Sequence, residues 1–336
     1  MKKIKIIDVA EHAGVSKSTI SQFLSGRFHY MSEGTRTRIE AAIKELNYVP
    51  NPIARSLKTD KTKTIGVIVR DITGYDTSRV LRGIDDLCKT SQYNVLIYNT
   101  DFNAEAEARA LQSLKEMRVD GIIISSSGKN VEMITEHIQS NLPLVQFQLE
   151  YEQCNTNIVL SDYRKAAFQA TEYLIRLGHT RICFMSQNFE GVRSREERYQ
   201  GYLDALTQYN IKEDKRLIQY WDRKNGFHTP LSNMLNMNHP PTALFPQHLA
   251  ITIATIQALK ILNITIPDDI SLLGFDDIPM VEHFKVPITV IKQDPYRVGV
   301  ESAKLLLECI NQTTPQARKI TIPCELVSRE SCKKLN

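Results

Sequence analysis

The stretch IDVAEHAGVSKSTISQFL, residues 7–24, decides the fold of the N-terminal part of the chain. Apolar residues recur at helical spacing up to Ala13, and Gly14 follows at a position where a positive φ is easily adopted. Ser16 is a good N-cap for a second helix over about 17–24, whose apolar face holds Ile20 and its neighbours. Two short helices joined by such a corner predict a helix-turn-helix, the second helix of which enters the major groove of DNA.

A third helix completes this domain. Ser32 is its expected N-cap, Glu33 lies in its first turn, and Ile39, Ile43 and Leu46 form an apolar stripe. The pattern predicts an all-α DNA-binding domain over residues 1–48, which is small but within the range that folds alone.

The outward face of the second helix supplies candidate DNA contacts. A glutamine such as Gln22 can pair with adenine through two hydrogen bonds. We expect Lys17, Ser18 and Gln22 to read base edges in the major groove. The hydroxyl groups expected on phosphates are those of Ser16, Thr19, Ser21 and Thr35.

The charge of the chain is concentrated in this head. Residues 1–63 contain 12 Lys/Arg and 6 Asp/Glu, whereas the remainder contains 30 and 32. A basic head on a nearly neutral body is typical of a module that binds a polyanion. The alternative, a basic solvated tail, fits the ordered helical patterns less well.

Residues 49–63 predict a hinge. Pro50 blocks extension of the third helix, Asn51 can act as a cap, and Pro52 suits the first position of a helix. Fewer than two helical turns follow, and such a helix is stable only against a partner. Leu57 is therefore a candidate wedge between base steps in the minor groove, and the alternative is a linker whose Leu57 packs on the body.

Beyond Thr64, short apolar runs alternate with amphipathic stretches. The runs are 65–69, 94–98, 121–125, 144–147, 181–185, 243–245 and 270–274. The amphipathic stretches lie near 78–90, 104–118, 130–140, 164–177, 195–209 and 248–262. This α/β alternation predicts two lobes, each a doubly wound parallel sheet covered on both faces, with a ligand cleft beyond the carboxyl ends of the strands.

Composition excludes several classes of protein. The chain has 336 residues, 42% hydrophobic and 24% charged, as expected for a soluble globular protein of two or three domains. No run of 18 apolar residues and no secretory signal are present, so we expect a cytoplasmic, nucleoid-associated protein. The six scattered cysteines form no CxxC pair and fit a reducing compartment; they are Cys88, Cys154, Cys183, Cys309, Cys324 and Cys332.

No pattern suggests an enzyme. The sequence contains neither a phosphate-binding P-loop nor an HExxH metal motif. Asp276 and Asp277 could form a carboxylate pair, but adjacent residues at a strand end point in different directions. We therefore expect no catalytic residues, no cofactor and no metal.

Several segments together resemble the LacI/GalR family of bacterial repressors. They are residues 8–21, 51–57, 63–69, 271–277 and 325–332, so the resemblance covers nearly the whole chain. It implies a two-lobed body like that of periplasmic binding proteins, with lobes at 64–162 plus 293–321 and at 163–292 plus 322–336. It also implies a hinge helix that contacts DNA through Asn51, Ala54 and Leu57.

The resemblance also implies an effector site in the cleft. Asp276 matches an acceptor of sugar hydroxyls, Arg198 an effector-contacting arginine, and Trp221 an aromatic platform. The other implied contacts are Tyr75, Gln148, Ser194 and His248. Core packing of Trp221, and an ion pair of Arg198 with Glu196 or Asp204, remain as alternatives.

Two departures from the family pattern bear on the ligand. Gln148 stands where many relatives carry Asp, and His248 and Leu249 stand where many carry an Asn-Asp pair. Loss of carboxylates near Arg198 favours a sugar acid over a neutral sugar. The segment 16–28 also resembles the ketodeoxygluconate-repressor branch of the family.

These features predict a repressor that binds a pseudo-palindromic operator as a homodimer, with a small-molecule effector that alters the affinity for DNA. The chain ends without a heptad tail, which favours a dimer over a tetramer. Two other interpretations stay open. One is a solute-binding protein, and the other is a regulator that answers to a protein co-effector and keeps only a vestigial pocket.

Overall fold

The computed structural model describes residues 4–49, 61–150, 156–277, 280–311 and 317–335. The chain divides into two compact units, Met1–Thr62 and Lys63–Asn336, and each is described by itself. The hinge positions Asn51, Ala54 and Leu57 lie outside the described residues, as does Cys154.

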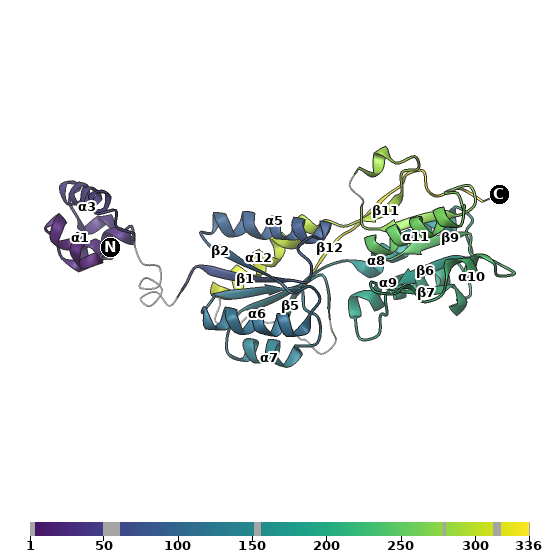
Figure 1. Cartoon of the computed structure of the whole chain (residues 1–336), viewed down its shortest axis with the longest axis horizontal. Helices are drawn as coiled ribbons and strands as arrows, with labels where there is room; N and C mark the ends of the chain where they lie inside the picture. Colours follow the sequence, from purple (N-terminus) through teal and green to yellow (C-terminus); the bar gives the residue numbers. More distant parts are fainter. Residues whose placement is uncertain (1–3, 50–60, 151–155, 278–279, 312–316, 336) are drawn as a thin grey trace. The chain divides into compact units, whose positions relative to one another are not determined.

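The first unit is a three-helix domain made of α1 (Ile6–Ala13), α2 (Lys17–Leu24) and α3 (Glu33–Glu45) (Figure 1). A short 3₁₀ turn, η1 (Phe28–Tyr30), precedes α3. The core consists of small and β-branched side chains, namely Val9, Ala10, Ala13, Ile20, Ile39 and Ala42.

The predicted boundaries of these helices are confirmed. Gly14 ends α1 with φ +62°, the left-handed conformation that favours glycine. Ser16 and Ser32 are the N-caps of α2 and α3. Their hydroxyl groups accept hydrogen bonds from the backbone N–H groups of Thr19 and Thr35.

The second unit contains two sheets. The first has the order β12-β5-β4-β3-β1-β2, and all of its strand pairs are parallel. Its strands are β1 (Thr64–Val69), β2 (Asn94–Asn99), β3 (Gly121–Ile124), β4 (Leu144–Phe147), β5 (Asn157–Ser161) and β12 (Lys319–Ile322). The helices α5 (Tyr75–Thr90) and α12 (Pro295–Asn311) cover one face, and α6 (Ala104–Glu116) and α7 (Val131–Gln139) cover the other (Figure 1).

The second sheet has the order β13-β11-β10-β9-β6-β7-β8, and its two outer pairs, β11–β13 and β7–β8, are antiparallel. Its strands are β6 (Ile182–Ser186), β7 (Ile218–Asp222), β8 (Gly226–Phe227), β9 (Ala243–Pro246), β10 (Ser271–Phe275), β11 (Thr289–Lys292) and β13 (Glu325–Val327). Two hydrophobic cores join this sheet to its helices. One core includes α8 (Tyr163–Arg176) and α9 (Arg193–Gln208), and the other includes α10 (Leu231–Leu235) and α11 (Leu249–Ile261). The short turns are η2 (Lys215–Leu217) and η3 (Val281–His283).

The chain passes between the two sheets three times, after β5, after β11 and after β12. One expectation for the first sheet is wrong. The run 94–98 was expected to be covered on both faces, but β2 is an edge strand with exposed side chains, including Leu96 and Ile97. An edge position explains the difference because only one neighbouring strand protects it.

Candidate functional site

A cavity of about 600 Å³ lies within the second unit, where strands of both sheets end. Its walls come from the segments that follow β1, β2, β3, β4, β5, β6, β7, β9, β10 and β11, all at the carboxyl ends of parallel strands. Ligands of open α/β sheets bind at this edge. The cavity is therefore the candidate ligand site of the second unit.

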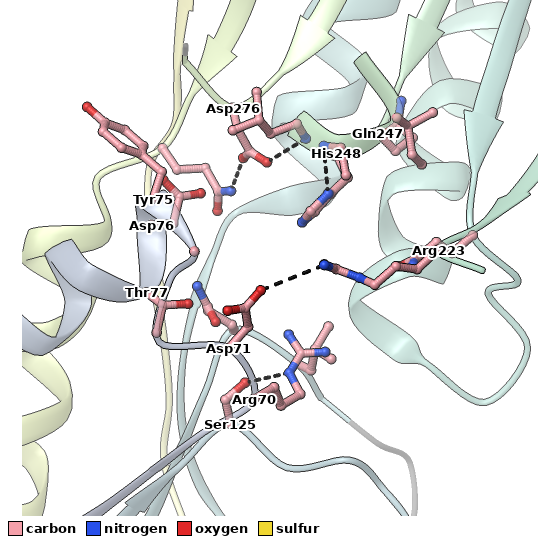
Figure 2. A pocket seen from close by; sticks show the side chains of 18 of the residues that line it. Arg70, Asp71, Tyr75, Asp76, Thr77, Ser125, Arg223, Gln247, His248 and Asp276 are labelled. Carbon is pink, nitrogen blue, oxygen red and sulfur yellow. Dashed lines mark hydrogen bonds and ion pairs between the residues drawn. The ribbon is translucent and has the colours of Figure 1, made fainter. Parts of the chain in front are cut away.

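Asp276 anchors one end of this cavity. It follows β10 with φ +75°, and its side chain is almost completely buried. One carboxylate oxygen, Oδ2, accepts a hydrogen bond from the Leu249 backbone N–H at 3.1 Å, and Oδ1 accepts one from the Gln293 amide. These bonds fix the carboxylate so that its remaining acceptor sites face the cavity (Figure 2).

Asp76, which was not among the predicted site residues, provides a second carboxyl group at this end. It lies in the first turn of α5 and lines the cavity. Burial, followed by the negative charge of Asp276, raises the pKa of Asp76 to about 8. At neutral pH Asp76 is thus a carboxylic acid that can donate a hydrogen bond as well as accept one.

Arg198 stacks between two aromatic rings beside these carboxyl groups. Its guanidinium carbon lies 4.0 Å from the ring centre of Tyr163 and 4.6 Å from that of Phe275. The ion-pair alternative fails. Glu196 accepts from the Gly191 backbone, and Asp204 binds Arg164 at 2.6 Å. Arg198 instead lines the cavity, where its planar group can donate to a ligand.

His248 caps α11 and lines the middle of the cavity. Its Nδ1 accepts a hydrogen bond from the Ala250 backbone N–H at 3.1 Å, which leaves the proton of the neutral ring on Nε2. Desolvation by the surrounding protein lowers the pKa of His248 to about 4. The negative charge of Asp276 opposes this shift, and the nearby arginines add to it. His248 is therefore a neutral donor at pH 7 rather than a charged group.

Two further arginines, Arg70 and Arg223, lie at the opposite end of the cavity (Figure 2). The guanidinium carbons of Arg70 and Arg223 lie 5.5 and 4.5 Å from the centre of the Phe102 ring. Arg70 also donates to the Ser125 hydroxyl at 3.1 Å, and Arg223 forms an ion pair with Asp71 at 3.7 Å. Arg70 belongs to the loop after β1 and Arg223 to the loop after β7, so residues from both sheets meet here.

The remaining predicted contacts divide into two groups. Tyr75 and Gln148 line the cavity, and the Tyr163 hydroxyl donates to the backbone carbonyl of Gln148 at 3.0 Å. Ser194 is fully buried and is not part of the cavity wall. Trp221 does not line the cavity either, because it packs in the core of the second sheet, as the alternative interpretation had it. The side chain that reaches the cavity from this strand end is Arg223, two residues further on.

In the first unit, the polar residues of α2 turn away from the helical core. Lys17 and Ser18 are exposed, whereas Ser21 and Gln22 are half-buried. The Ser16 hydroxyl lies 2.6 Å from that of Ser18 and 2.8 Å from that of Thr19, so the three hydroxyls cluster at the N-terminus of the helix. A helix N-terminus that carries hydroxyl groups suits a phosphate.

Among the described residues, no group of three or more His, Cys, Asp or Glu side chains could hold a metal ion. In the same residues, no helix is long and apolar enough to cross a membrane.

Comparison with known proteins identifies the family. Residues 5–51 match the model described as "Bacterial regulatory proteins, lacI family". The "Probable HTH-type transcriptional regulator EndR" of Paenibacillus polymyxa is 34% identical to this chain over 98% of both proteins. The chain belongs to the LacI family of transcriptional regulators. Residues 171–332 match a "Periplasmic binding protein-like domain", in agreement with the predicted body of the LacI family.

Two solved structures are similar over most of their length. The lac repressor dimer bound to operator and the anti-inducer ONPF is 26% identical to this chain, covers 99% of this chain and 100% of its own, and has a TM-score of 0.83. A LacI family transcriptional regulator from Enterococcus faecium with bound ribose is 26% identical and covers 81% of this chain and 100% of its own, with a TM-score of 0.71. The predicted family and fold class are confirmed, and the ketodeoxygluconate branch stays a prediction.

Proposed function

We propose that this LacI-family regulator is a cytoplasmic, nucleoid-associated repressor that binds a pseudo-palindromic operator as a homodimer. A sugar or sugar acid in the cavity would change its affinity for DNA. The observation that carries the ligand half of the proposal is the cavity itself, with hydroxyl acceptors at one end and cationic donors at the other.

The DNA half rests on α2. Its apolar face is buried in the core of the first unit, which leaves Lys17 and Ser18 exposed for base edges and the hydroxyl cluster around Ser16 for phosphate. The lac repressor relative is a dimer on its operator, which supports the twofold arrangement for this chain. The hinge hypothesis for Asn51, Ala54 and Leu57 remains part of the proposal.

The ligand half follows from size and chemistry. A volume of about 600 Å³ is ordinary for a small-molecule site. Asp276 can accept two hydroxyl hydrogens, and Arg198 and His248 can donate to hydroxyl or carboxylate oxygens. The Enterococcus faecium relative holds ribose, which supports a carbohydrate ligand here.

The charge of the wall favours an acid. Four arginines and four aspartates line the cavity: Arg70, Arg195, Arg198, Arg223, Asp71, Asp76, Asp101 and Asp276. Because Asp76 is protonated at neutral pH, the cations outnumber the carboxylates by one. A carboxylate on the ligand would neutralise this excess.

The polar groups that converge on the cavity from both sheets support a small-molecule ligand over a vestigial pocket. The solute-binding alternative is incompatible with membership of the LacI family, whose helix-turn-helix model this chain matches.

The test measures DNA and ligand binding together. We expect the full chain to bind a twofold-symmetric operator selected from random DNA, with an affinity that falls steeply as salt rises. Addition of sugar acids or sugars should change that affinity by about 5- to 150-fold. Calorimetry with the same compounds gives the binding stoichiometry. Binding of none of them, with operator binding intact, would contradict the carbohydrate part of the proposal.

A further inference from the structure

We propose that Arg223 and Arg70 form the subsite for the anionic group of the effector, and that Asp71 is the protein carboxylate that this group displaces. The inference rests on the proposed function and makes it more specific, because it assigns the two ends of the cavity to different parts of the ligand.

The first step is the geometry of the two cations. Both guanidinium groups lie against the same ring, that of Phe102, at 4.5 and 5.5 Å from its centre. Phe102 has φ +61°, and the backbone conformation of its loop brings the ring toward the two arginines. Stacking on a ring occupies the face of a guanidinium group, so the N–H donors on its edges can bond to side chains and to a ligand.

The second step concerns Asp71, the carboxylate already beside Arg223. Its Oδ1 is held by the Thr73 backbone N–H at 3.0 Å and by the Thr73 hydroxyl at 2.6 Å. Its Oδ2 lies 3.7 Å from Arg223 Nη1, which is within ion-pair range but too long for a hydrogen bond. Asp71 thus neutralises Arg223 without using its donors, so a free carboxylate that makes two short bonds would compete well.

The third step is the contrast with Arg198. That arginine stacks between Tyr163 and Phe275, and its positive charge acts on Asp76, at the end of the cavity that holds Asp276. An anionic group placed there would face the Asp276 carboxylate. At the Phe102 end, by contrast, the charged groups beside the ring are Arg70 and Arg223, and His248 supplies a neutral N–H donor in the middle of the cavity, between the two ends.

The arrangement therefore fits a polyhydroxy carboxylate with its hydroxyl groups at Asp276 and Asp76 and its carboxylate at Arg223 and Arg70. Since these two arginines follow strands of different sheets, such a ligand would also join the two halves of the second unit. Hexuronates and ketodeoxy-aldonates have this distribution of groups.

The experiment uses the full chain and matched pairs of probes in calorimetry. The probes are galacturonate with galactose, glucuronate with glucose, and ketodeoxygluconate. We expect an acid to bind more tightly than its neutral partner. Arg223→Gln should lower the affinity for the acid by about tenfold or more and leave the affinity for the neutral sugar unchanged. Arg70→Gln should act in the same direction.

Two further variants sharpen the test. Arg216→Gln removes an equal charge from an exposed side chain of the same unit that pairs with Asp214, so it should leave the affinity unchanged. Asp71→Asn removes the competing charge and keeps an oxygen for Thr73, so it should raise the affinity for the acid by several-fold.

The outcomes separate the two proposals. Unchanged binding of an acid by Arg223→Gln, together with loss in an Arg198→Gln variant, would overturn the subsite and leave the proposed function intact. Preference for a neutral sugar would overturn the subsite as well. Failure of every probe to bind the wild-type chain would overturn both this inference and the carbohydrate part of the proposed function.

Discussion

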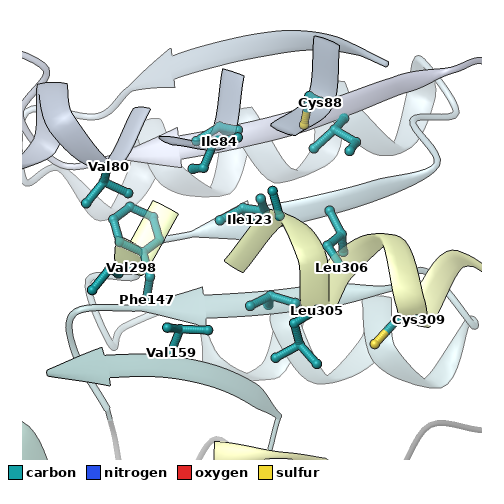
Figure 3. Packing of buried hydrophobic residues seen from close by; sticks show 14 of the residues in the cluster. Val80, Ile84, Cys88, Ile123, Phe147, Val159, Val298, Leu305, Leu306 and Cys309 are labelled. Atoms are coloured by element: carbon teal, nitrogen blue, oxygen red, sulfur yellow. The ribbon is translucent and has the colours of Figure 1, made fainter. Parts of the chain in front are cut away.

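The two units of this regulator differ in the sequence separation of the residues that form their cores. The fully buried core of the first unit comes from residues 9–42, and the partly buried side chains packed against it extend this range only to residues 4–48. One core of the second unit, shown in Figure 3, joins Ile84 of α5, Phe147 of β4 and Leu306 of α12, and extends from residue 65 to residue 322. The cavity has the same character, since its walls come from the segments that follow ten different strands. The first unit is therefore encoded by residues that are close in the chain, whereas the second unit depends on contacts between distant segments.

The largest expected effect is a loss of stability confined to the first unit. Ile20 is completely buried between the helices of its small core. Ile20→Ala should cost about 2–5 kcal/mol, which is most of the stability that a domain of this size has. We expect operator binding to be lost and the helical circular dichroism of the first unit to melt early.

Trp221 provides the matching control. It is the only tryptophan of the chain and is buried in the second unit, so its fluorescence reports unfolding of that unit. The urea midpoint of this signal should not change in Ile20→Ala. A shift of both transitions together would show that the two units unfold as one.

A second substitution should destabilise the second unit alone. Gly201 in α9 faces α8 so closely that a Cβ atom would lie 2.1 Å from the Arg164 carbonyl oxygen. Because that neighbour is backbone, the helices must separate, and Gly201→Ala should cost about 1–3 kcal/mol. The fluorescence midpoint of Trp221 should fall while the first unit keeps its helical signal.

A glycine of the first unit serves as the control. A Cβ atom at Gly34 in α3 would meet nothing within 4 Å. Gly34→Ala should therefore stabilise the first unit by a few tenths to about 1 kcal/mol. A stability loss in that variant would mean that conformational entropy does not govern this position.

The same contrast explains how much could be predicted from the sequence. The caps at Ser16 and Ser32 and the turn at Gly14 were predicted because each signal involves residues a few positions apart. In the second unit the alternation predicted the class of fold, but short strands such as β8 and β13 have no pattern of their own. They exist because a neighbouring strand provides their hydrogen bonds.

The candidate site follows the same rule. Asp276, Arg198 and His248 were found through motif resemblance and do line the cavity. Trp221 was misplaced, because an aromatic residue in a strand has the same local signal whether it faces a ligand or a core. Asp76 and Arg223 were missed because neither follows a motif, although charged residues just beyond strand or loop ends were the available signal.

The stability of the second unit should depend on pH through Asp76. Burial and Asp276 raise the pKa of Asp76 to about 8, above its value in the unfolded chain. The folded state therefore binds more protons than the unfolded state between about pH 4 and pH 8, and the stability of the second unit should fall as the pH rises through this range. Asp76→Asn should flatten that fall when Trp221 fluorescence is followed in urea at several pH values. An equal slope in the variant would contradict the assignment to Asp76.

The smallest expected effect concerns the positive charge of the first unit and its contribution to DNA binding. Lys17 is exposed at the start of α2 and was predicted to contact DNA, whereas Lys215 is exposed in the second unit. Each Lys→Gln substitution removes one positive charge from the surface, so non-specific effects of net charge are matched. A lysine that lies against the duplex releases a counterion on binding, so Lys17→Gln should lower the slope of log affinity against log salt by about one. Anisotropy titrations at several salt concentrations measure this slope, and Lys215→Gln should leave it unchanged. Equal slopes for the two variants would place Lys17 away from the DNA and would require another face of the first unit to make the contact.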